Sequence, residues 1–350
     1  MKITHIHIER FRGFQNEDFE VGSLLTAIAG QNGTQKSTLL GIITQTFTLK
    51  TEDSMRVEKP MCGGRYISAF KDKFRLSPTF DKPKGHEWTI SFDAGMDDFT
   101  VESIKRTGDP NVRFWKKGAR QEGDGYISFP TIFLSLKRLV PVAEEAKIIT
   151  DDTLLTQEEL NEFKQLHNKI LIAQTPISSA TTITSKNKQS IGVSTELYDW
   201  NQNSMGQDNL GKIILALFSF KRLHDKYPRQ YKGGILAIDE MDATMYPASQ
   251  VELLKVLRKY ASKLNLQILF TTHSMSLLKA MDDLVQEVTK KEETANQAKI
   301  LYLKKVDDKI AIKQGVNFKG IQLDLNVVAE GNNRKKNRIT AYTEDLSLIH

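Results

Sequence analysis

Three short stretches of the sequence carry residue types that suit nucleotide chemistry. The first is GQNGTQKST, in which Gly30 and Gly33 lead into Lys36 and Ser37. An apolar segment, residues 24–29, precedes this loop, and a helical pattern follows it. A strand that turns into a helix around glycines places backbone N–H groups and a helix N-terminus around an anion. In such a loop Lys36 would reach the β- and γ-phosphates, and the Ser37 hydroxyl would complete a Mg²⁺ shell.

The other two stretches are apolar segments that end in polar side chains. GILAIDEMD ends in Asp239 and Glu240, and LQILFTTHS ends in His273. Ligands of α/β proteins bind beside the carboxyl ends of the strands. There Asp239 would hold Mg²⁺ through water, Glu240 would deprotonate the attacking water, and His273 would sense the γ-phosphate. Each motif alone also fits an ordinary turn or a structural histidine, but three such strand ends in this order favour a nucleotide site.

One residue departs from the phosphate-loop pattern G-x-x-x-x-G-K-[ST]. Gln35 stands before Lys36, where a glycine lets the backbone approach the phosphates without a Cβ. If its φ lies in the helical region the cost is small, because glutamine is a good helix former and this residue begins the helix. We therefore expect a site that binds ATP and hydrolyses it, with Gln35 as the residue that would slow hydrolysis. An engineered substitution at this position stays open.

The elements around these motifs follow an α/β pattern. Continuous apolar runs such as ILAI and QILF, each followed by a polar turn and a helix, are typical of parallel strands covered on both faces. Strands are predicted at 3–8, 24–29, 88–92, 99–104, 131–136, 235–238, 266–271 and 298–303. Helices are predicted at 36–47, 157–173, 210–226, 248–264 and 275–291. Residues 176–190, rich in serine and threonine without an apolar period, are predicted to form a mobile surface loop.

The order GQNGTQKST, NSMGQDN, LAIDEMD, TTHS resembles that of the ABC-type ATPases of the SMC, RecF and OLD-nuclease branch. The resemblance covers about residues 1–325 and implies a P-loop head. Such a head is an α/β fold with a mixed sheet flanked by helices, an antiparallel β subdomain and a short helical insertion, here at about 150–200. Residues 326–350 would be a linker and the start of a further domain.

The resemblance also implies roles for single residues, with ATP and Mg²⁺ as cofactors. It implies a signature loop that caps the γ-phosphate of ATP on another subunit, formed by Ser204, Gly206 and Gln207. Taken without the family, that stretch is an ordinary polar helix cap. Glu240 and His273 would be catalytic, Asp242 would belong to the loop that couples two composite sites, and Ser37 and Asp239 would hold the metal. The implied ATP-binding residues are Arg12, Gly30, Asn32, Gly33, Thr34, Gln35, Lys36, Ser37 and Thr38.

Between the phosphate loop and the signature, residues 39–203 contain no heptad repeats, which excludes the long coiled-coil arms of SMC proteins. The compact form looks more like RecF, the OLD nucleases, and the ATPase subunits of anti-phage systems such as Gabija and Septu. The final stretch, ITAYTEDLSLIH, resembles the opening of a Toprim nuclease domain, with Glu344 and Asp345 at a strand end. Its further acidic ligands are missing, so we expect no complete nuclease site.

Composition favours a soluble protein, and its positive charge favours contact with a polyanion, although 43 acidic residues are interspersed with the basic ones. Of 350 residues 39% are apolar, the formal net charge is +6, no run is long enough to span a membrane, and Cys62 is the only cysteine. We expect a cytoplasmic homodimer or higher oligomer of ATPase heads that controls a nuclease, either a partner or a missing C-terminal domain, in DNA processing or anti-phage defence. Two alternatives remain: a weakly hydrolysing, ATP-bound DNA clamp or scaffold, and a RecF-like repair protein.

Overall fold

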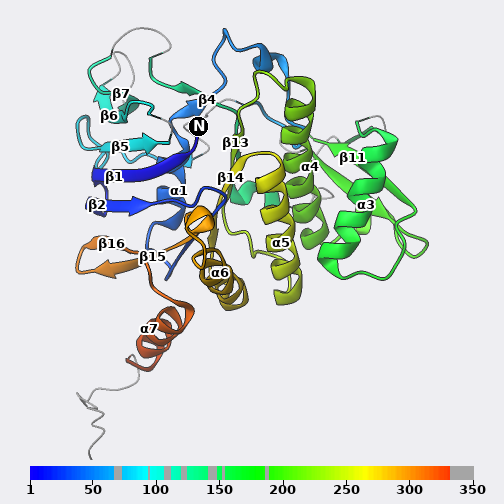
Figure 1. Cartoon of the computed structure of the whole chain (residues 1–350). Coiled ribbons are helices and arrows are strands. Elements are labelled where there is room, and N and C mark those ends of the chain that lie inside the picture. The colour runs from blue at the N-terminus through cyan, green and yellow to red at the C-terminus, as the bar shows by residue number, and fades with distance from the viewer. Residues whose placement is uncertain are drawn as a thin grey trace, which may run out of the picture.

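The computed structural model describes residues 1–66, 73–93, 95–105, 112–119, 124–140, 148–151, 154–185 and 189–331. Its centre is a six-stranded sheet in the order β16-β15-β3-β14-β13-β9 (Figure 1). All neighbours are parallel except β16, which is antiparallel to β15, so the sheet is mixed as predicted. Its strands are β3 (Leu25–Gly30), β9 (Thr131–Leu134), β13 (Gly234–Ile238), β14 (Leu266–Thr272), β15 (Ala298–Val306) and β16 (Lys309–Lys313).

Both faces of the five parallel strands are buried, because their successive side chains enter two different cores, whereas the edge strand β16 contributes to one core only. On one face, residues such as Leu236 and Ile268 pack with α4 (Met205–Lys226), α5 (Pro247–Lys263) and α6 (Met275–Val288). On the other face, residues such as Ile235 and Leu269 pack with α1 (Lys36–Thr44). This explains why these strands are continuous apolar runs in the sequence.

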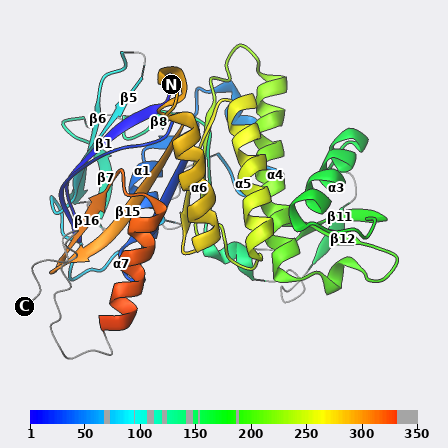
Figure 2. The ribbon, with the colours of Figure 1, turned by 60° about the horizontal axis from the view of Figure 1, so that its bottom comes forward.

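An antiparallel β subdomain covers the α1 side of the molecule, as predicted. Its strand order is β2-β1-β5-β6-β7, and it lies on the side of α1 (Figure 2). Its apolar side chains share one core with α1. The subdomain places the turn after β1, which holds Arg12 and Gly13, next to the phosphate loop. The bounds are β1 (Ile3–Phe11), β2 (Phe14–Glu20), β5 (Glu87–Phe92), β6 (Phe99–Lys105) and β7 (Val112–Lys116). The short strands β4 (Phe47–Thr48) and β8 (Ile127–Ser128) pair with each other.

The insertion lies beyond α4 and α5 and contains more strand than expected (Figures 1 and 2). Helix α3 (Gln157–Leu171) matches the helical prediction, and a capping box of Thr156 and Glu159 begins it. The prediction of a mobile loop at residues 176–190 is wrong. β11 (Ser179–Thr184) and β12 (Gln189–Ser194) form a hairpin, and β10 (Ile149–Asp151) pairs with β11. Threonine is a good strand former, and the hairpin buries Ile183 and Ile191, which the polar composition obscures.

The C-terminal part also differs from the prediction. The prediction of a linker from residue 326 is wrong for residues 326–331, because α7 (Phe318–Gly331) continues through them, and residues 332–350 lie outside the described part of the chain. The Toprim-like stretch with Glu344 and Asp345 lies outside the described residues. Within the described part of the chain, no helix has the length and apolar character that crossing a membrane requires.

The insertion contains a histidine that should make stability depend on pH. His167 of α3 is 2% exposed, and burial lowers its pKa from 6.5 to about 4. Because the unfolded chain then takes up the proton first, this contribution to stability is complete above pH 6.5 and is lost as the pH falls toward 4. Between pH 7 and pH 4 the free energy of unfolding should fall by about 3 kcal/mol through His167 alone.

Urea unfolding of the wild type and of His167→Gln at both pH values measures this difference. The variant should lose about 3 kcal/mol less than the wild type on acidification. His224→Gln, at a half-exposed histidine of α4, is the control. Equal losses in the wild type and His167→Gln would contradict the prediction.

Candidate active site

Three neighbouring strands of the central sheet end at the phosphate loop and at the two polar motifs. β14 lies between β3 and β13, in parallel register with both. The carboxyl end of β3 is Gly30, β13 is followed by Asp239 and Glu240, and β14 by His273. The sheet thus brings the phosphate loop to two motifs that lie about 200 residues or more after it in sequence, as the contact between Ser37 and Asp239, 202 residues apart, shows.

The phosphate loop has the backbone geometry that glycines permit. Gly30 has a φ of 151°, and a Cβ on it would lie 2.4 Å from the carbonyl oxygen of Leu303. Gly33 has a φ of 79°, in the left-handed region that favours glycine. Lys36 is buried, and its Nζ donates to the carbonyl oxygens of Gly30 and Gln31, at 3.1 and 2.9 Å. Its ammonium therefore lies within the loop, at the place where phosphate oxygens would replace these carbonyl acceptors.

Gln35 differs from the expectation of a helical φ, since it has a φ of 61° and a ψ of 31°. This left-handed conformation costs a side-chain-bearing residue about 1 kcal/mol and explains why the loop pattern has glycine here. The glutamine side chain turns away from the loop toward the β1–β2 turn, where its Nε2 lies 2.8 Å from the position of a Cβ on Gly13. Its Oε1 is buried and has no hydrogen-bond partner among the residues that the structure describes.

This backbone geometry predicts an inverted order of stability at position 35. Elsewhere in a helix alanine is more stable than glycine by about 1 kcal/mol, but a Cβ at positive φ reverses that preference. Gln35→Gly should therefore have a free energy of unfolding about 1 kcal/mol higher than Gln35→Ala. Both variants lose the glutamine amide, so their comparison isolates the backbone. Urea unfolding measures it, and a Gln35→Ala protein as stable as Gln35→Gly would contradict the left-handed conformation.

Asp239 forms the centre of the site. Its side chain is nearly buried, and Oδ1 accepts hydrogen bonds from the hydroxyls of Ser37, at 2.8 Å, and Thr271, at 2.7 Å. Mg²⁺ prefers few protein ligands, all oxygen, together with water and substrate phosphates. The Ser37 hydroxyl and the Asp239 carboxylate are such ligands and lie side by side at the start of α1, so these residues fit the metal.

Glu240, Asp242 and His273 lie close to Asp239 and Lys36. The backbone N–H of Glu240 donates to the Thr271 hydroxyl at 2.6 Å, which fixes the start of its side chain. The backbone N–H of His273 lies 3.4 Å from Oδ1 of Asp242. Burial and the charge of Lys36 lower the pKa of His273, and the nearby carboxylates only partly offset this effect. Burial likewise lowers the pKa of Lys36 against the same carboxylates.

The proposed signature residues lie elsewhere, at the N-terminus of α4. Ser204 caps this helix in a capping box with Gln207, whose side chain also donates to the Tyr198 hydroxyl. Gly206 packs against the loop after β13, because a Cβ on it would lie 2.6 Å from the carbonyl oxygen of Thr244. The structure thus shows the helix cap that the sequence alone suggested and joins it to the Asp242 loop.

Three further residues that the resemblance assigns to ATP binding, Arg12, Asn32 and Thr38, lie in different surroundings from one another. Arg12 forms an ion pair with Asp81 and donates to the Arg75 carbonyl oxygen, so its guanidinium is directed toward that segment. Asn32 is exposed at the tip of the phosphate loop, and Thr38 is partly buried in the first turn of α1.

Sequence reasoning missed Arg138 and Asn209, both buried beside the site. Arg138 lies in η2 (Leu136–Leu139), directly after β9, and donates to the carbonyl oxygens of Asp239 and Glu240. The sequence offered one signal near Arg138, a predicted strand that ends at residue 136. An arginine just after a strand usually indicates a solvated turn, so this signal did not mark Arg138 as buried.

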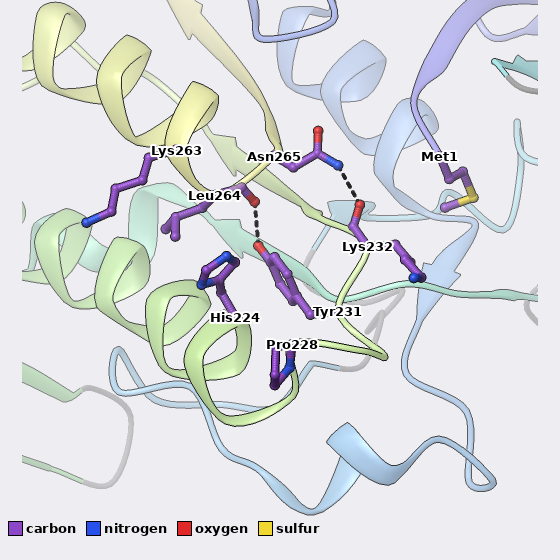
Figure 3. A pocket seen from close by; sticks show the side chains of 8 residues that line it. All are labelled: Met1, His224, Pro228, Tyr231, Lys232, Lys263, Leu264 and Asn265. Atoms are coloured by element: carbon purple, nitrogen blue, oxygen red, sulfur yellow. Dashed lines mark hydrogen bonds between the residues drawn. The ribbon is translucent and has the colours of Figure 1, made fainter.

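A surface pocket lies at the opposite edge of the sheet. Tyr231, Leu264 and Asn265 line it with Met1 and Lys232 (Figure 3). β13 and β14 begin at Gly234 and Leu266, so the pocket is at their amino ends. It is therefore separate from the candidate active site.

Comparison with known proteins supports the same type of fold. Residues 135–278 match the family model of the AAA ATPase domain. An SMC head bound to the C-winged helix domain of ScpA superposes with a TM-score of 0.51 at 14% identity, over 92% of this chain and all of that one.

Two other solved structures are less similar. The SMC head domain from Thermotoga maritima gives a TM-score of 0.48 at 14% identity, over 90% of this chain and 100% of that one. The recombination mediator protein RecF gives 0.44 at 11% identity, over 90% of this chain and 98% of that one. No curated protein sequence matches significantly. The chain therefore has the mixed α/β fold of an SMC-type ATPase head, with a match to the AAA ATPase domain over residues 135–278.

Proposed function

We propose that this chain binds ATP with Mg²⁺ and hydrolyses it at a site that two copies complete together. The observation that carries the proposal is the contact between the Ser37 hydroxyl and the Asp239 carboxylate, at 2.8 Å, beside Lys36 and Glu240. A loop that donates N–H groups, a lysine, a hydroxyl and two carboxylates are the parts that phosphoryl transfer to water requires.

Each residue has a distinct part in this reaction. Lys36 would exchange its carbonyl partners for the β- and γ-phosphate oxygens and neutralise their charge. Ser37 and Asp239 would hold Mg²⁺, which supplies further charge neutralisation. Glu240 would accept a proton as water attacks the γ-phosphorus and the bond from that atom to the β-phosphate oxygen breaks, releasing ADP and phosphate. His273, kept neutral near pH 7 by its lowered pKa, would donate a hydrogen bond to the γ-phosphate.

The second copy would supply the N-terminus of α4. Ser204 is exposed, and Met205 beside it is 47% exposed. A helix N-terminus attracts anions through its free N–H groups and its dipole. The capping box of Ser204 and Gln207 fixes this helix start, and the exposure of the helix start supports contact with a γ-phosphate held by a second chain.

The wider role in our proposal is control of a nuclease by nucleotide-dependent dimerisation, in DNA processing or anti-phage defence. The resemblance of the motifs and of the final residues to OLD and Gabija proteins supports it. The SMC head bound to a domain of ScpA offers a parallel, a head that docks a partner. The left-handed Gln35 favours the alternative of a slowly hydrolysing clamp on DNA, since it alters the phosphate loop.

Phosphate release at saturating ATP and Mg²⁺, measured over a wide range of protein concentrations, tests the proposal. A site shared between chains predicts a rate per chain that rises with concentration and then reaches a plateau. Hydrolysis at a constant rate per chain would show a site complete in one copy. No hydrolysis at any concentration would leave the clamp as the better account.

A further inference from the structure

We infer that Arg138 is a positioning residue that fixes the Asp239–Glu240 turn and joins it to the start of the signature helix α4. The inference rests on the proposed function, because it assigns the turn's geometry a role in ATP hydrolysis. It concerns a buried arginine that neither the motifs nor the family match singles out.

The hydrogen bonds of Arg138 lead to three parts of the site. Its Nη1 donates to the Asp239 carbonyl oxygen at 2.6 Å, and its Nη2 to the Glu240 carbonyl oxygen at 2.8 Å. Its Nε donates to Oδ1 of Asn209 at 2.7 Å. The planar guanidinium is the one side chain that offers donors in this fixed fork. Arg138 is 2% exposed, so these bonds are shielded from water.

Asn209 continues the connection to the loop that follows. It is fully buried in the second turn of α4, and its Nδ2 donates to the Ala243 carbonyl oxygen at 2.9 Å. One turn earlier, Gly206 packs on the Thr244 carbonyl oxygen. A continuous set of contacts therefore runs from the helix start that would face the second chain, through Asn209 and Arg138, to the backbone of Glu240.

The turn that Arg138 holds has an unusual backbone. Glu240 has a φ of 48° and Thr244 a φ of 67°, both in the left-handed region that non-glycine residues rarely adopt. Such conformations persist when the surroundings fix them, and they concentrate at functional sites. The bond from Arg138 to the Glu240 carbonyl oxygen is one of the contacts that fix this one, and it sets where the carboxylate points.

Charge gives Arg138 a second effect on the turn. Its guanidinium makes no direct ion pair with a carboxylate in the described residues. It still interacts electrostatically with the carboxylates of Asp239, Glu240 and Asp242. A guanidinium stays charged at neutral pH. It therefore offsets part of the repulsion among three acidic groups in one loop.

Steady-state ATP hydrolysis and amide hydrogen exchange of the full chain test the inference. Arg138→Lys keeps the charge but loses the fork, and Arg138→Met loses both. For each we expect kcat to fall about 10- to 100-fold, as for other residues that orient a ligating group, with KM for ATP within about threefold of wild type. Residues 239–246 should exchange at least about tenfold faster, because their backbone loses its anchor.

Two further variants sharpen the test. Arg222→Lys changes an arginine in the same helix as Asn209 that bonds Glu159 of the insertion, and it should leave kcat unchanged. Asn209→Asp keeps the oxygen that accepts from Arg138 and removes the N–H that donates to Ala243. It should lower kcat without changing KM, and it serves if the Arg138 variants do not fold.

The outcomes separate this inference from the proposed function. Unchanged kcat in Arg138→Lys, or a loss of kcat matched by an equal loss of folded protein, overturns the positioning role. If the wild type hydrolyses no ATP, the proposed function fails, and amide hydrogen exchange alone tests the role of Arg138. Faster exchange of residues 239–246 in Arg138→Lys then supports the structural link, and unchanged exchange overturns it.

Discussion

Glu240→Gln should bind ATP with wild-type affinity and hydrolyse it at least about 100-fold more slowly. Glutamine has the same shape as glutamate but cannot accept the proton of the attacking water. The main-chain bonds that place residue 240, from its N–H to the Thr271 hydroxyl and from Arg138 to its carbonyl oxygen, do not depend on the side chain. The turn should therefore keep its geometry, and the loss should fall on kcat alone.

Blocked hydrolysis should also change the assembly state. If ATP is held between two chains, Glu240→Gln with ATP and Mg²⁺ should accumulate as a dimer, measured by light scattering after size exclusion. Glu252→Gln, at a partly exposed glutamate of α5 that pairs with Lys255, is the matched control and should behave as wild type. A Glu240→Gln protein with more than about a third of the wild-type rate would show that another group accepts the proton.

Lys36→Met should lose ATP binding, with affinity lower by about 30-fold or more. Methionine nearly matches the length of lysine but has no charge and no N–H donor. Lys36 is 7% exposed, and its ammonium lies between the carbonyl oxygens of Gly30 and Gln31. Removing it takes away the one cation inside the phosphate loop, so the triphosphate charge would face carbonyl oxygens alone.

Calorimetric titration with ATP and Mg²⁺ measures the affinity of Lys36→Met. The control is Lys299→Met, which removes a lysine of β15 that pairs with Glu20 on the surface. It should bind ATP as the wild type does. Wild-type affinity in a folded Lys36→Met protein would mean that the nucleotide lies elsewhere.

The central part of the fold could be predicted from the sequence because its elements have strong periodic signals. The bounds of β13 and β14 lie within one residue of the predicted strands. Strands that are buried on both faces consist of continuous apolar residues, which the sequence shows clearly. The same signals located the phosphate loop, Asp239, Glu240 and His273, because each follows such a strand. The mixed sheet and the antiparallel β subdomain agree with the fold implied by the motifs.

The rest depended on packing that no local pattern contains. β11 and β12 are rich in polar residues and become strands through pairing with each other. The left-handed φ of Gln35 is set by the loop, so the favourable helical propensity of glutamine does not decide it. Arginine is usually a surface residue. Arg138 can be buried because oxygen atoms of Asn209, Asp239 and Glu240, distant in sequence, accept its hydrogen bonds.

Mixing two inactive variants tests whether two chains share the site. Lys36→Met lacks a working phosphate loop. Ser204→Asp keeps a good helix cap but places a negative charge where the second chain's γ-phosphate would lie, whereas Ser204→Asn keeps the cap without the charge. We expect Ser204→Asp to be inactive, and Ser204→Asn to keep most of the activity.

In an equal mixture of Lys36→Met and Ser204→Asp, each mixed dimer contains one site with an intact phosphate loop and an intact α4 start. We expect the mixture to hydrolyse ATP at up to about a quarter of the wild-type rate, since half of the dimers are mixed and each has one good site. If the mixture stays inactive although both proteins fold and Ser204→Asp binds ATP, the two halves of the site do not come from different chains.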